Sequence, residues 1–257
     1  MSSGSSGDLD FDGSTTIQYT GLEPVIMPSG SANLTINLVG GFDDVAILED
    51  NGTLNDNVSQ LRTTSGTAET FTFANPSASL TINLGAGVDG LEIASDFDNG
   101  PGAMQFDATL TIDGQGDSDS ITNSSVLALT NSVSLTAESI SIDADVTTTG
   151  ANQVYDGSVD FTGNRTLTGA NVNFRNGTTT FDGTNTTIDV TGIATSEATN
   201  LLDFHDGDLV LANGSSFVSA GMAQFQDGTG NMEFRGSGTF TNQGTFSHTA
   251  AGGHDNL

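Results

Sequence analysis

Apolar residues alternate with Ser, Thr or Asn in short runs along nearly the whole chain. A period of two with one apolar face predicts half-buried β-strands. The clearest runs are Leu34/Ile36/Leu38, Phe71/Phe73, Leu80/Ile82/Leu84, Leu110/Ile112, Val133/Leu135, Ile140/Ile142, Val159/Phe161, Val172/Phe174, Ile188/Val190 and Leu209/Leu211. Asn-Gly and Asp-Gly dipeptides, which favour tight turns, recur between the runs. The pattern therefore predicts many short strands joined by turns.

One strand–turn–strand phrase is repeated almost unchanged. Residues 34–47 read LTINLVGGFDDVAI and residues 80–93 read LTINLGAGVDGLEI, and a looser version, LTIDGQGDSDSI, begins at Leu110. Self-similarity of this kind indicates a repeat architecture, in which each unit buries its apolar face against its neighbours.

Two all-β architectures fit strands that recur this closely. Very short strands, polar faces rich in Thr, Asn and Ser, and Gly at the corners favour a parallel β-helix (a β-solenoid). Its coils would be roughly twenty residues long or a little more. An antiparallel β-sandwich in the N-terminal half is the alternative. The one segment with helical character is 195–205 (TSEATNLLDFH), where we expect a single short helix.

Composition shifts along the chain suggest four segments. Residues 1–7 (MSSGSSG) are typical of a linker or cloning scar, and residues 251–257 form a polar tail. Residues 8–125 form a block of β-repeats with Asp/Gly-rich turns, and residues 126–250 a more regular β-helix block. Since no Pro-rich or charged linker separates the two blocks, we expect one continuous rod that is part of a larger chain.

The charge balance narrows the range of partners. The formal net charge is −28, with four Arg, no Lys and 32 acidic residues, most of them Asp. Such a chain repels phosphate backbones, so we expect no nucleic-acid partner. No run approaches the roughly 18 apolar residues of a membrane span. Cysteine is absent, so no disulfide is available and cysteine usage does not indicate a compartment.

The Asp-rich turns are candidate calcium-binding sites. Residues 85–91 (GAGVDGL) fit the G-x-G-x-D-x-L pattern of calcium-binding β-rolls, in which neighbouring coils share an ion. The candidate metal ligands are Asp43, Asp89, Asp117 and Asp119. The copies are not in tandem, so they share an ion only if they stack in space. The alternatives are turns whose Asp bonds nearby backbone N–H groups, and an acidic surface adapted to salt.

Part of the chain resembles a known family. Residues 146–150 (VTTTG), 153–157 (QVYDG), 166–169 (TLTG) and 172–174 (VNF) resemble phrases in large bacterial surface proteins of the filamentous-haemagglutinin type. Residues 236–246 (GSGTFTNQGTF) are similar to coils of the same class, and residues 13–24 look like a phrase of giant repeat proteins. The resemblance implies a right-handed parallel β-helix, exported, that works in adhesion or as a surface stalk.

The sequence gives little support to an enzymatic function. A polysaccharide lyase needs a basic cleft, but the chain has no Lys and its four Arg are scattered. A P-loop also requires Lys, and no nucleophile-elbow motif is present. Ice binding would need ranks of Thr at a fixed coil spacing, and the Thr-rich patches at 147–149, 178–180 and 184–187 do not recur in that way.

We therefore expect a non-enzymatic structural and adhesive segment of a large exported bacterial surface protein, with no catalytic residue and with calcium as a candidate stabilising ion. Its partner would be a host-cell or surface carbohydrate or protein, and its location extracellular or at the cell surface, with the export signal outside this chain. The alternative is a carbohydrate-active β-helix enzyme or a sugar-binding module.

Overall fold

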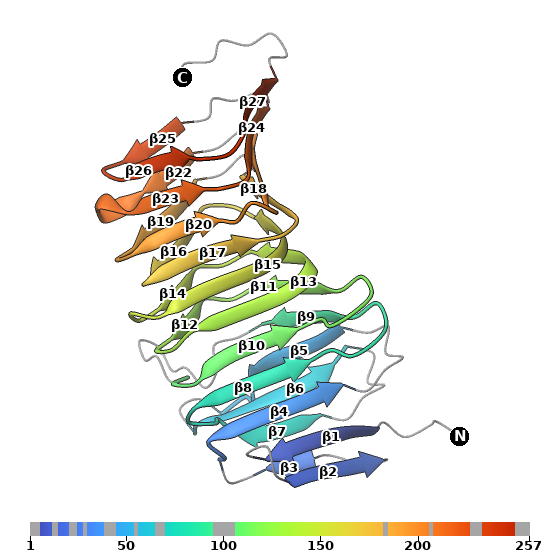
Figure 1. Ribbon diagram of the computed structural model, residues 1–257. Helices are drawn as coiled ribbons and strands as arrows, with labels where there is room; N and C mark the ends of the chain where they lie inside the picture. Colours follow the sequence, from blue (N-terminus) through green and yellow to red (C-terminus); the bar gives the residue numbers. More distant parts are fainter. Residues whose placement is uncertain are drawn as a thin grey trace.

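The computed structural model describes residues 6–11, 15–20, 25–27, 30–38, 45–53, 56–64, 70–94, 106–181, 185–205, 208–226 and 233–249. Its strands lie across one long axis, with the N-terminal strands at one end and the C-terminal strands at the other (Figure 1). The described residues contain no α-helix and a single 3₁₀ turn, Ala212–Gly214. Most strands pair in parallel with the strand one coil before and one coil after. The predicted parallel β-helix is confirmed.

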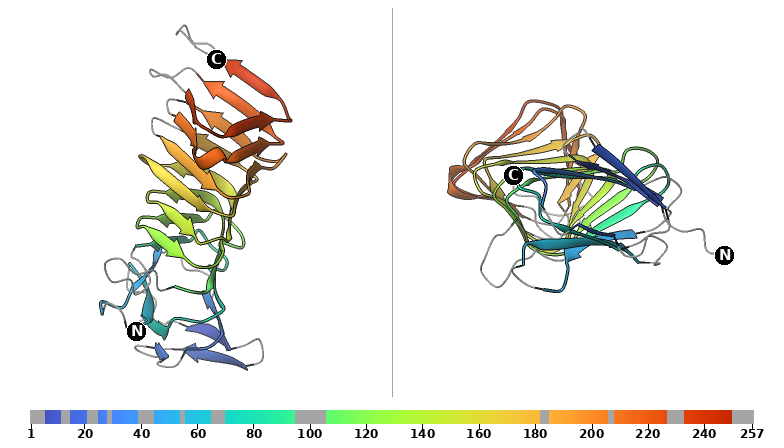
Figure 2. Two further views of the ribbon diagram at one scale, coloured as in Figure 1. Left: turned by 90° about the vertical axis from the view of Figure 1, so that its left-hand side faces the viewer. Right: turned by 90° about the horizontal axis from the view of Figure 1, so that it is seen from below.

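From β12 (Leu127–Leu129) onward the coils cross three faces, which surround a common core when the rod is viewed along its axis (Figure 2). The first face consists of β4 (Asn33–Leu38), β8 (Ser79–Asn83), β10 (Thr109–Asp113), the first halves of β13 (Val133–Ile142) and β15 (Asn152–Phe161), β17 (Asn171–Arg175), β20 (Ile193–Ser196), β23 (Ser216–Ser219) and β26 (Thr239–Asn242).

The second face follows it in each coil. It consists of β5 (Val45–Asp50), β9 (Gly90–Ile93), β11 (Ser120–Asn123), the second halves of β13 and β15, β18 (Thr178–Phe181), β21 (Leu201–Phe204), β24 (Met222–Gln226) and β27 (Phe246–Thr249). A separate six-stranded sheet forms the third face, with β12 (Leu127–Leu129), β14 (Val146–Thr148), β16 (Arg165–Gly169), β19 (Thr186–Val190), β22 (Asp208–Leu211) and β25 (Glu233–Gly236).

The coil length is regular in the C-terminal part of the rod. Tyr155 pairs with Phe174 and Phe217 pairs with Phe240, separations of 19 and 23 residues. These values agree with the predicted length of about twenty residues or a little more. Earlier coils are longer, since Leu34 pairs with Leu80 and Leu80 with Leu110. The longest coil accommodates two extra strands, β6 (Val58–Thr63) and β7 (Phe71–Ala74).

Alternate residues of each strand fill the core. In β10 and β8 the buried positions are those that the hydrophobic alternation predicted, and Leu80, Ile82, Leu110 and Ile112 are fully buried. In later coils the second face buries a column of Phe181, Phe204 and Phe225, whose ring centroids lie 4.8 Å apart at each step. In-register stacking of apolar residues therefore builds a thin core along the whole rod.

Among the described residues, antiparallel pairing is confined to the N-terminal end and to the inserted strands. β1 (Ser6–Phe11) pairs antiparallel with β4 and with β2 (Thr15–Thr20), and β6 lies antiparallel between β5 and β7. β3 (Val25–Met27) runs parallel to β7. The N-terminal half is thus part of the same parallel stack, and the alternative of an antiparallel sandwich there is wrong.

The short helix expected at 195–205 is also wrong. This segment contains the end of β20 and the whole of β21, where Leu202 and Phe204 alternate into the core. β21 pairs with β18 and β24, which places Phe204 in the aromatic column. Burial of an aromatic residue in a stacked column outweighs the weak local helix propensity.

Candidate functional surfaces

The near-identical phrases of the N-terminal block stack directly on one another. Thr35 pairs with Thr81, and Thr81 with Thr111, so β4, β8 and β10 are in register. The strands after the turns also pair, with Val45 opposite Gly90 and Gly90 opposite Ser120. The described turns that join β8 to β9 and β10 to β11, at residues 84–89 and 114–119, therefore lie at one corner of the rod.

Acidic side chains at this corner accept backbone hydrogen bonds from the adjacent coil. Asp117 Oδ2 accepts the N–H of Gly87 at 3.2 Å, and Asp119 Oδ1 accepts the N–H of Asp89 at 3.0 Å. Glu138 Oε2 in turn accepts the N–H of Asp119 at 2.8 Å. Asp side chains in turns commonly accept a hydrogen bond from a backbone N–H of the same turn. Here the carboxylates instead link one coil to the next.

Asp119 is the most deeply buried acid of the corner, at 2% exposure. Its Oδ2 has no hydrogen-bond partner among the described residues, and a Cβ added to Gly114 would lie 2.6 Å from this oxygen. Burial raises the pKa of Asp119, the bond from Asp89 N–H opposes the shift, and Glu138, Asp117 and Asp113 raise the pKa further. Asp119 is therefore a carboxylate whose ionised form is disfavoured.

The predicted calcium ligands are only partly brought together. Asp89 and Asp119 lie on adjacent coils and are joined through the backbone bond, whereas Asp117 is exposed. Asp43 lies outside the described residues. Within the described ranges, no three His, Asp or Glu side chains are grouped so that they could hold a metal ion. One carboxylate oxygen of Asp117 and one of Asp119 are used here as acceptors for backbone N–H groups of the adjacent coil.

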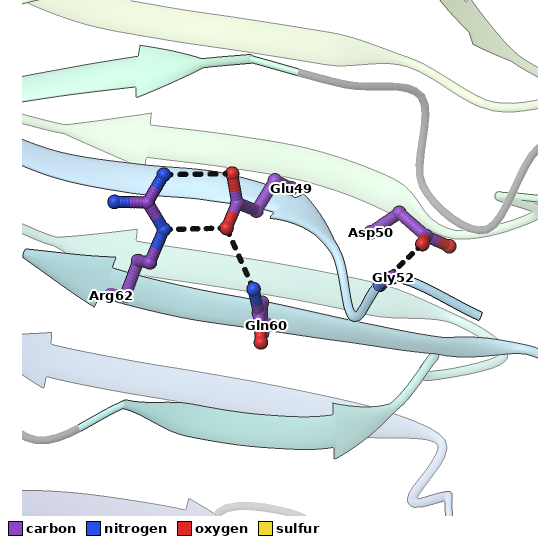
Figure 3. A network of polar contacts seen from close by, with 5 residues as sticks. All are labelled: Glu49, Asp50, Gly52, Gln60 and Arg62. Atoms are coloured by element: carbon purple, nitrogen blue, oxygen red, sulfur yellow. Dashed lines mark hydrogen bonds and ion pairs between the residues drawn. The ribbon is translucent and has the colours of Figure 1, made fainter.

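Arg62 on the inserted strand β6 is held by an ion pair (Figure 3). Glu49 Oε1 accepts hydrogen bonds from Arg62 Nε and Gln60 Nε2, each at 2.6 Å, and Glu49 Oε2 accepts one from Arg62 Nη2 at 3.1 Å. The bond to Glu49 raises the pKa of Arg62. In the adjoining turn, Asp50 Oδ1 accepts the N–H of Gly52 at 2.6 Å. This network fixes the insertion on the rod.

The other arginines lie on separate coils, and two of them form ion pairs as well. Arg175 Nε lies 3.0 Å from Glu197, and Arg235 Nε lies 3.0 Å from Asp208 and 2.8 Å from Glu233. Arg165 donates to the carbonyl oxygen of Asn164. The described arginines therefore do not gather into the basic cleft that an acidic polysaccharide substrate would require.

The first face carries an uncharged column of outward-facing side chains, which we name the central column. It runs in register through all nine strands of this face, and its members are Thr35, Thr81, Thr111, Ser134, Val154, Asn173, Thr195, Val218 and Thr241. With strands about 4.8 Å apart, the column is roughly 40 Å long. None of its members is charged, although the chain carries 32 acidic residues.

Amide and hydroxyl groups link neighbouring coils on this face. Thr195 Oγ1 donates to Asn173 Oδ1 at 2.9 Å, and Asn171 Nδ2 donates to Asn152 Oδ1 at 2.8 Å. Local sequence patterns did not reveal the column, because its members are separated by 19 to 46 residues along the chain. Only the register of the coils brings them into one line.

A second polar network was also missed from the sequence. On the second face, His205 Nε2 lies 3.0 Å from Asp203 Oδ2, and Gln226 Nε2 donates to both Asp203 oxygens at 2.9 Å. The available signal was the two-residue spacing of Asp203 and His205, which places both on one side of a strand. The network links β21 to β24.

Comparison with known proteins adds no identification: no protein-family model, no curated protein and no solved structure matches the chain. Over the ranges that the structure describes, there is no helix long and apolar enough to cross a membrane.

Proposed function

We propose that this chain is a non-enzymatic structural and adhesive segment of an exported bacterial surface protein. The observation that carries the proposal is the unbroken register of nine strands on the first face, which makes the chain a rod with a continuous, repetitive surface. Each coil contacts its neighbours through backbone ladders, side-chain bonds and core packing, as expected for a solenoid that resists bending.

The central column is the adhesive surface in this proposal. Seven of the nine uncharged side chains along roughly 40 Å carry a hydroxyl or amide group and offer weak hydrogen-bonding positions at the spacing of the strands. The net charge of −28 opposes binding to acidic polymers, so the matching ligand is a neutral surface rich in hydroxyl groups, such as a neutral polysaccharide. Repetition along the column allows avidity without any deep pocket.

The direct test is retention of the purified chain on insoluble neutral polysaccharides. Thr111→Asp and Thr195→Asp place charges on the central column and should abolish retention. Matched controls are Thr147→Asp and Thr187→Asp, which lie half-buried on the third face, have uncharged partners on the neighbouring strands and should leave retention unchanged. The proposal that the central column is the adhesive surface would be wrong if both pairs of variants lost retention equally. It would also be wrong if the wild-type chain were not retained on any neutral polysaccharide.

The same purified chain can be used to distinguish the adhesive proposal from the enzyme alternative. A carbohydrate-active enzyme would release new reducing ends or unsaturated products from a polysaccharide, whereas an adhesive rod leaves the polymer intact. The distribution of the described arginines over separate ion pairs supports the adhesive reading over a lyase.

Calcium stabilisation is a further part of the proposal. What supports it is the acidic corner, where Asp119 has a buried oxygen without a hydrogen-bond partner among the described residues. Thermal melts followed by circular dichroism, first with EDTA and then with millimolar calcium, test it. A midpoint that rises with calcium means that the ion binds the folded state. An unchanged midpoint leaves the carboxylates as acceptors for backbone N–H groups alone.

A further inference from the structure

A second uncharged column runs beside the central column on the first face. Its members lie two residues before those of the central column in each coil, from Asn33 on β4 to Thr239 on β26. They are three Asn, three Ser, two Thr and one Ile, and all are exposed or half-buried. Since alternate residues of a strand are roughly 7 Å apart, the two columns form one surface, which we name the neutral strip.

Hydrogen bonds between coils hold the second column in line. Ser79 Oγ donates to Asn33 Oδ1 at 2.8 Å. Asn171 Nδ2 donates to Asn152 Oδ1 at 2.8 Å, and Asn171 Oδ1 accepts the N–H of Ile193 at 2.8 Å. These bonds fix the amide groups in place before any ligand binds, which lowers the ordering cost of binding.

The neutral strip is long along the rod axis and narrow across it. On one side it ends at the corner where the strands of the first face begin. On the other side the next outward residues along the strands include Asp113 on β10, Asp156 on β15 and Arg175 on β17. No member of the neutral strip is charged, on a chain of net charge −28. A long, narrow and neutral ligand matches this surface.

The area of the neutral strip argues against a folded protein as the partner. A strip about 40 Å long and 10 Å wide covers roughly 400 Å². This is about half of the roughly 800 Å² that each partner buries in a typical stable protein interface. A folded partner that covered more would also remove Asp113 and Asp156 from water, which is costly for an unpaired carboxylate.

The chemistry of the neutral strip requires a ligand that makes many contacts at once. No member is aromatic, so a sugar ring finds no stacking surface there. Most members offer a hydroxyl or an amide, and Val154, Ile193 and Val218 offer apolar contact. Each hydrogen bond to a ligand is weak in water because it replaces a bond to water. Affinity therefore depends on repetition along one molecule.

We propose that the neutral strip binds a single extended chain of a neutral polysaccharide, which lies along the rod axis and contacts successive coils. This inference rests on the proposed adhesive function and adds the form of the ligand, one polymer chain that crosses many strands. Short oligosaccharides and packed polysaccharide surfaces are the alternatives that the test separates from it.

Affinity electrophoresis in native gels tests the inference on the intact chain. A protein of net charge −28 migrates strongly, whereas a dissolved neutral polymer does not. The probes are matched pairs of an insoluble and a dissolved polysaccharide: cellulose with hydroxyethyl cellulose, starch granules with pullulan, and curdlan with laminarin. We expect at least one dissolved polymer to slow the chain, with no dependence on salt because neither the strip nor the polymer is charged. Fragments that span less than half of the strip, roughly 20 Å, should bind at least about tenfold more weakly.

Two variants test whether one polymer chain runs along the axis. Thr109→Asp and Ser216→Asp place a carboxylate in the second column on β10 and on β23, which lie five strand spacings apart, roughly 24 Å. Each variant alone should weaken binding at least about tenfold, because the ligand would cover an unpaired charge. Thr147→Asp and Thr187→Asp on the third face are the controls and should leave binding unchanged. Circular dichroism confirms that all four variants are folded.

The outcomes separate this inference from the adhesive function itself. Retention on an insoluble polysaccharide, with no effect of any dissolved chain, would overturn the inference and leave the adhesive function standing. Equal weakening in the third-face controls, or weakening in only one of the two strip variants, would also overturn it. If no neutral polysaccharide binds in either form, both proposals are wrong. Dimerisation in sedimentation velocity that Thr109→Asp and Ser216→Asp abolish would place a second copy on the neutral strip and overturn the inference.

Discussion

The hydroxyl of Tyr155 donates a 2.8 Å hydrogen bond to Oε1 of Gln153, and both side chains are fully buried. The amide nitrogen of Gln153 donates to the carbonyl oxygens of Val146 at 3.2 Å and Thr168 at 2.8 Å. These carbonyls belong to β14 and β16, so one side chain joins two successive coils of the third face. The phrases VTTTG, QVYDG and TLTG therefore meet in one buried polar cluster.

Removing this cluster should destabilise the fold. Tyr155→Phe leaves Gln153 Oε1 buried without its donor, which should lower the free energy of unfolding by about 1–2 kcal/mol. Gln153→Leu removes the donor to two carbonyls and leaves the buried Tyr155 hydroxyl without its acceptor, so it should cost more, about 3 kcal/mol. Urea unfolding followed by circular dichroism measures both. Asn152→Ala, which removes only the exposed bond from Asn171, should stay within about 0.5 kcal/mol. A Tyr155→Phe variant as stable as wild type would contradict the role of the cluster.

The strands and the coil length could be predicted from the sequence because both depend on local patterns. The alternation of Leu80/Ile82 and Leu110/Ile112 indicates which side of each strand is buried, and the structure places these residues in the core. The similarity of residues 34–47 and 80–93 predicted stacking, and Leu34 does pair with Leu80.

The sequence did not allow us to predict which residues are neighbours on adjacent coils. The coil that begins at β4 contains the extra strands β6 and β7, so its spacing differs from that of later coils. The bond from Asp89 N–H to Asp119 depends on a register 30 residues apart, and no local pattern specifies it. The hairpin of β1 and β2 was missed for the same reason, since alternation alone does not distinguish antiparallel from parallel pairing.

Gly157 is a position where only glycine fits. It has φ +140° and lies opposite a bulge of β13, and an added Cβ would come 1.7 Å from the carbonyl oxygen of Ala137. Gly157→Ala should therefore lower the free energy of unfolding by about 3 kcal/mol or more. The control is Gly150→Ala, at φ +68° with open space around the added Cβ, which should cost about 1 kcal/mol of backbone strain. Similar losses in the two variants, compared by urea unfolding, would show that the close approach to Ala137 is unimportant.

The aromatic column of the second face should carry much of the stability of the C-terminal coils. Phe204 is fully buried, with Phe181 and Phe225 each 4.8 Å away. Phe204→Ala should cost about 3–5 kcal/mol, because it removes apolar contacts and leaves a cavity in a thin core. Val126→Ala, at a side chain that is 50% exposed, should cost less than about 0.5 kcal/mol. Thermal melts distinguish the two, and a small loss for Phe204→Ala would mean that the coil collapses around the cavity.

Asp119 should make stability depend on pH in a specific direction. Burial raises the pKa of Asp119 in the folded state above its ordinary value of 3.8, so the folded state binds this proton more tightly than the unfolded state. The contribution of this group to the free energy of unfolding therefore falls as pH rises through the folded pKa. Above the folded pKa the ionised, buried carboxylate is a net cost, and below pH 3.8 that cost is absent.

Asp119→Asn keeps an oxygen that can accept the N–H of Asp89 and removes the ionisation. The variant should be more stable than wild type at neutral pH, and the difference should shrink toward zero as pH falls below the ordinary pKa. Urea unfolding at several pH values measures the difference directly. Asp160→Asn, at an exposed position on β15, controls for the loss of one negative charge and should change stability by less than about 0.5 kcal/mol. A variant that is less stable than wild type at neutral pH, with a difference independent of pH, would show that Asp119 is retained as a carboxylate for its hydrogen bond.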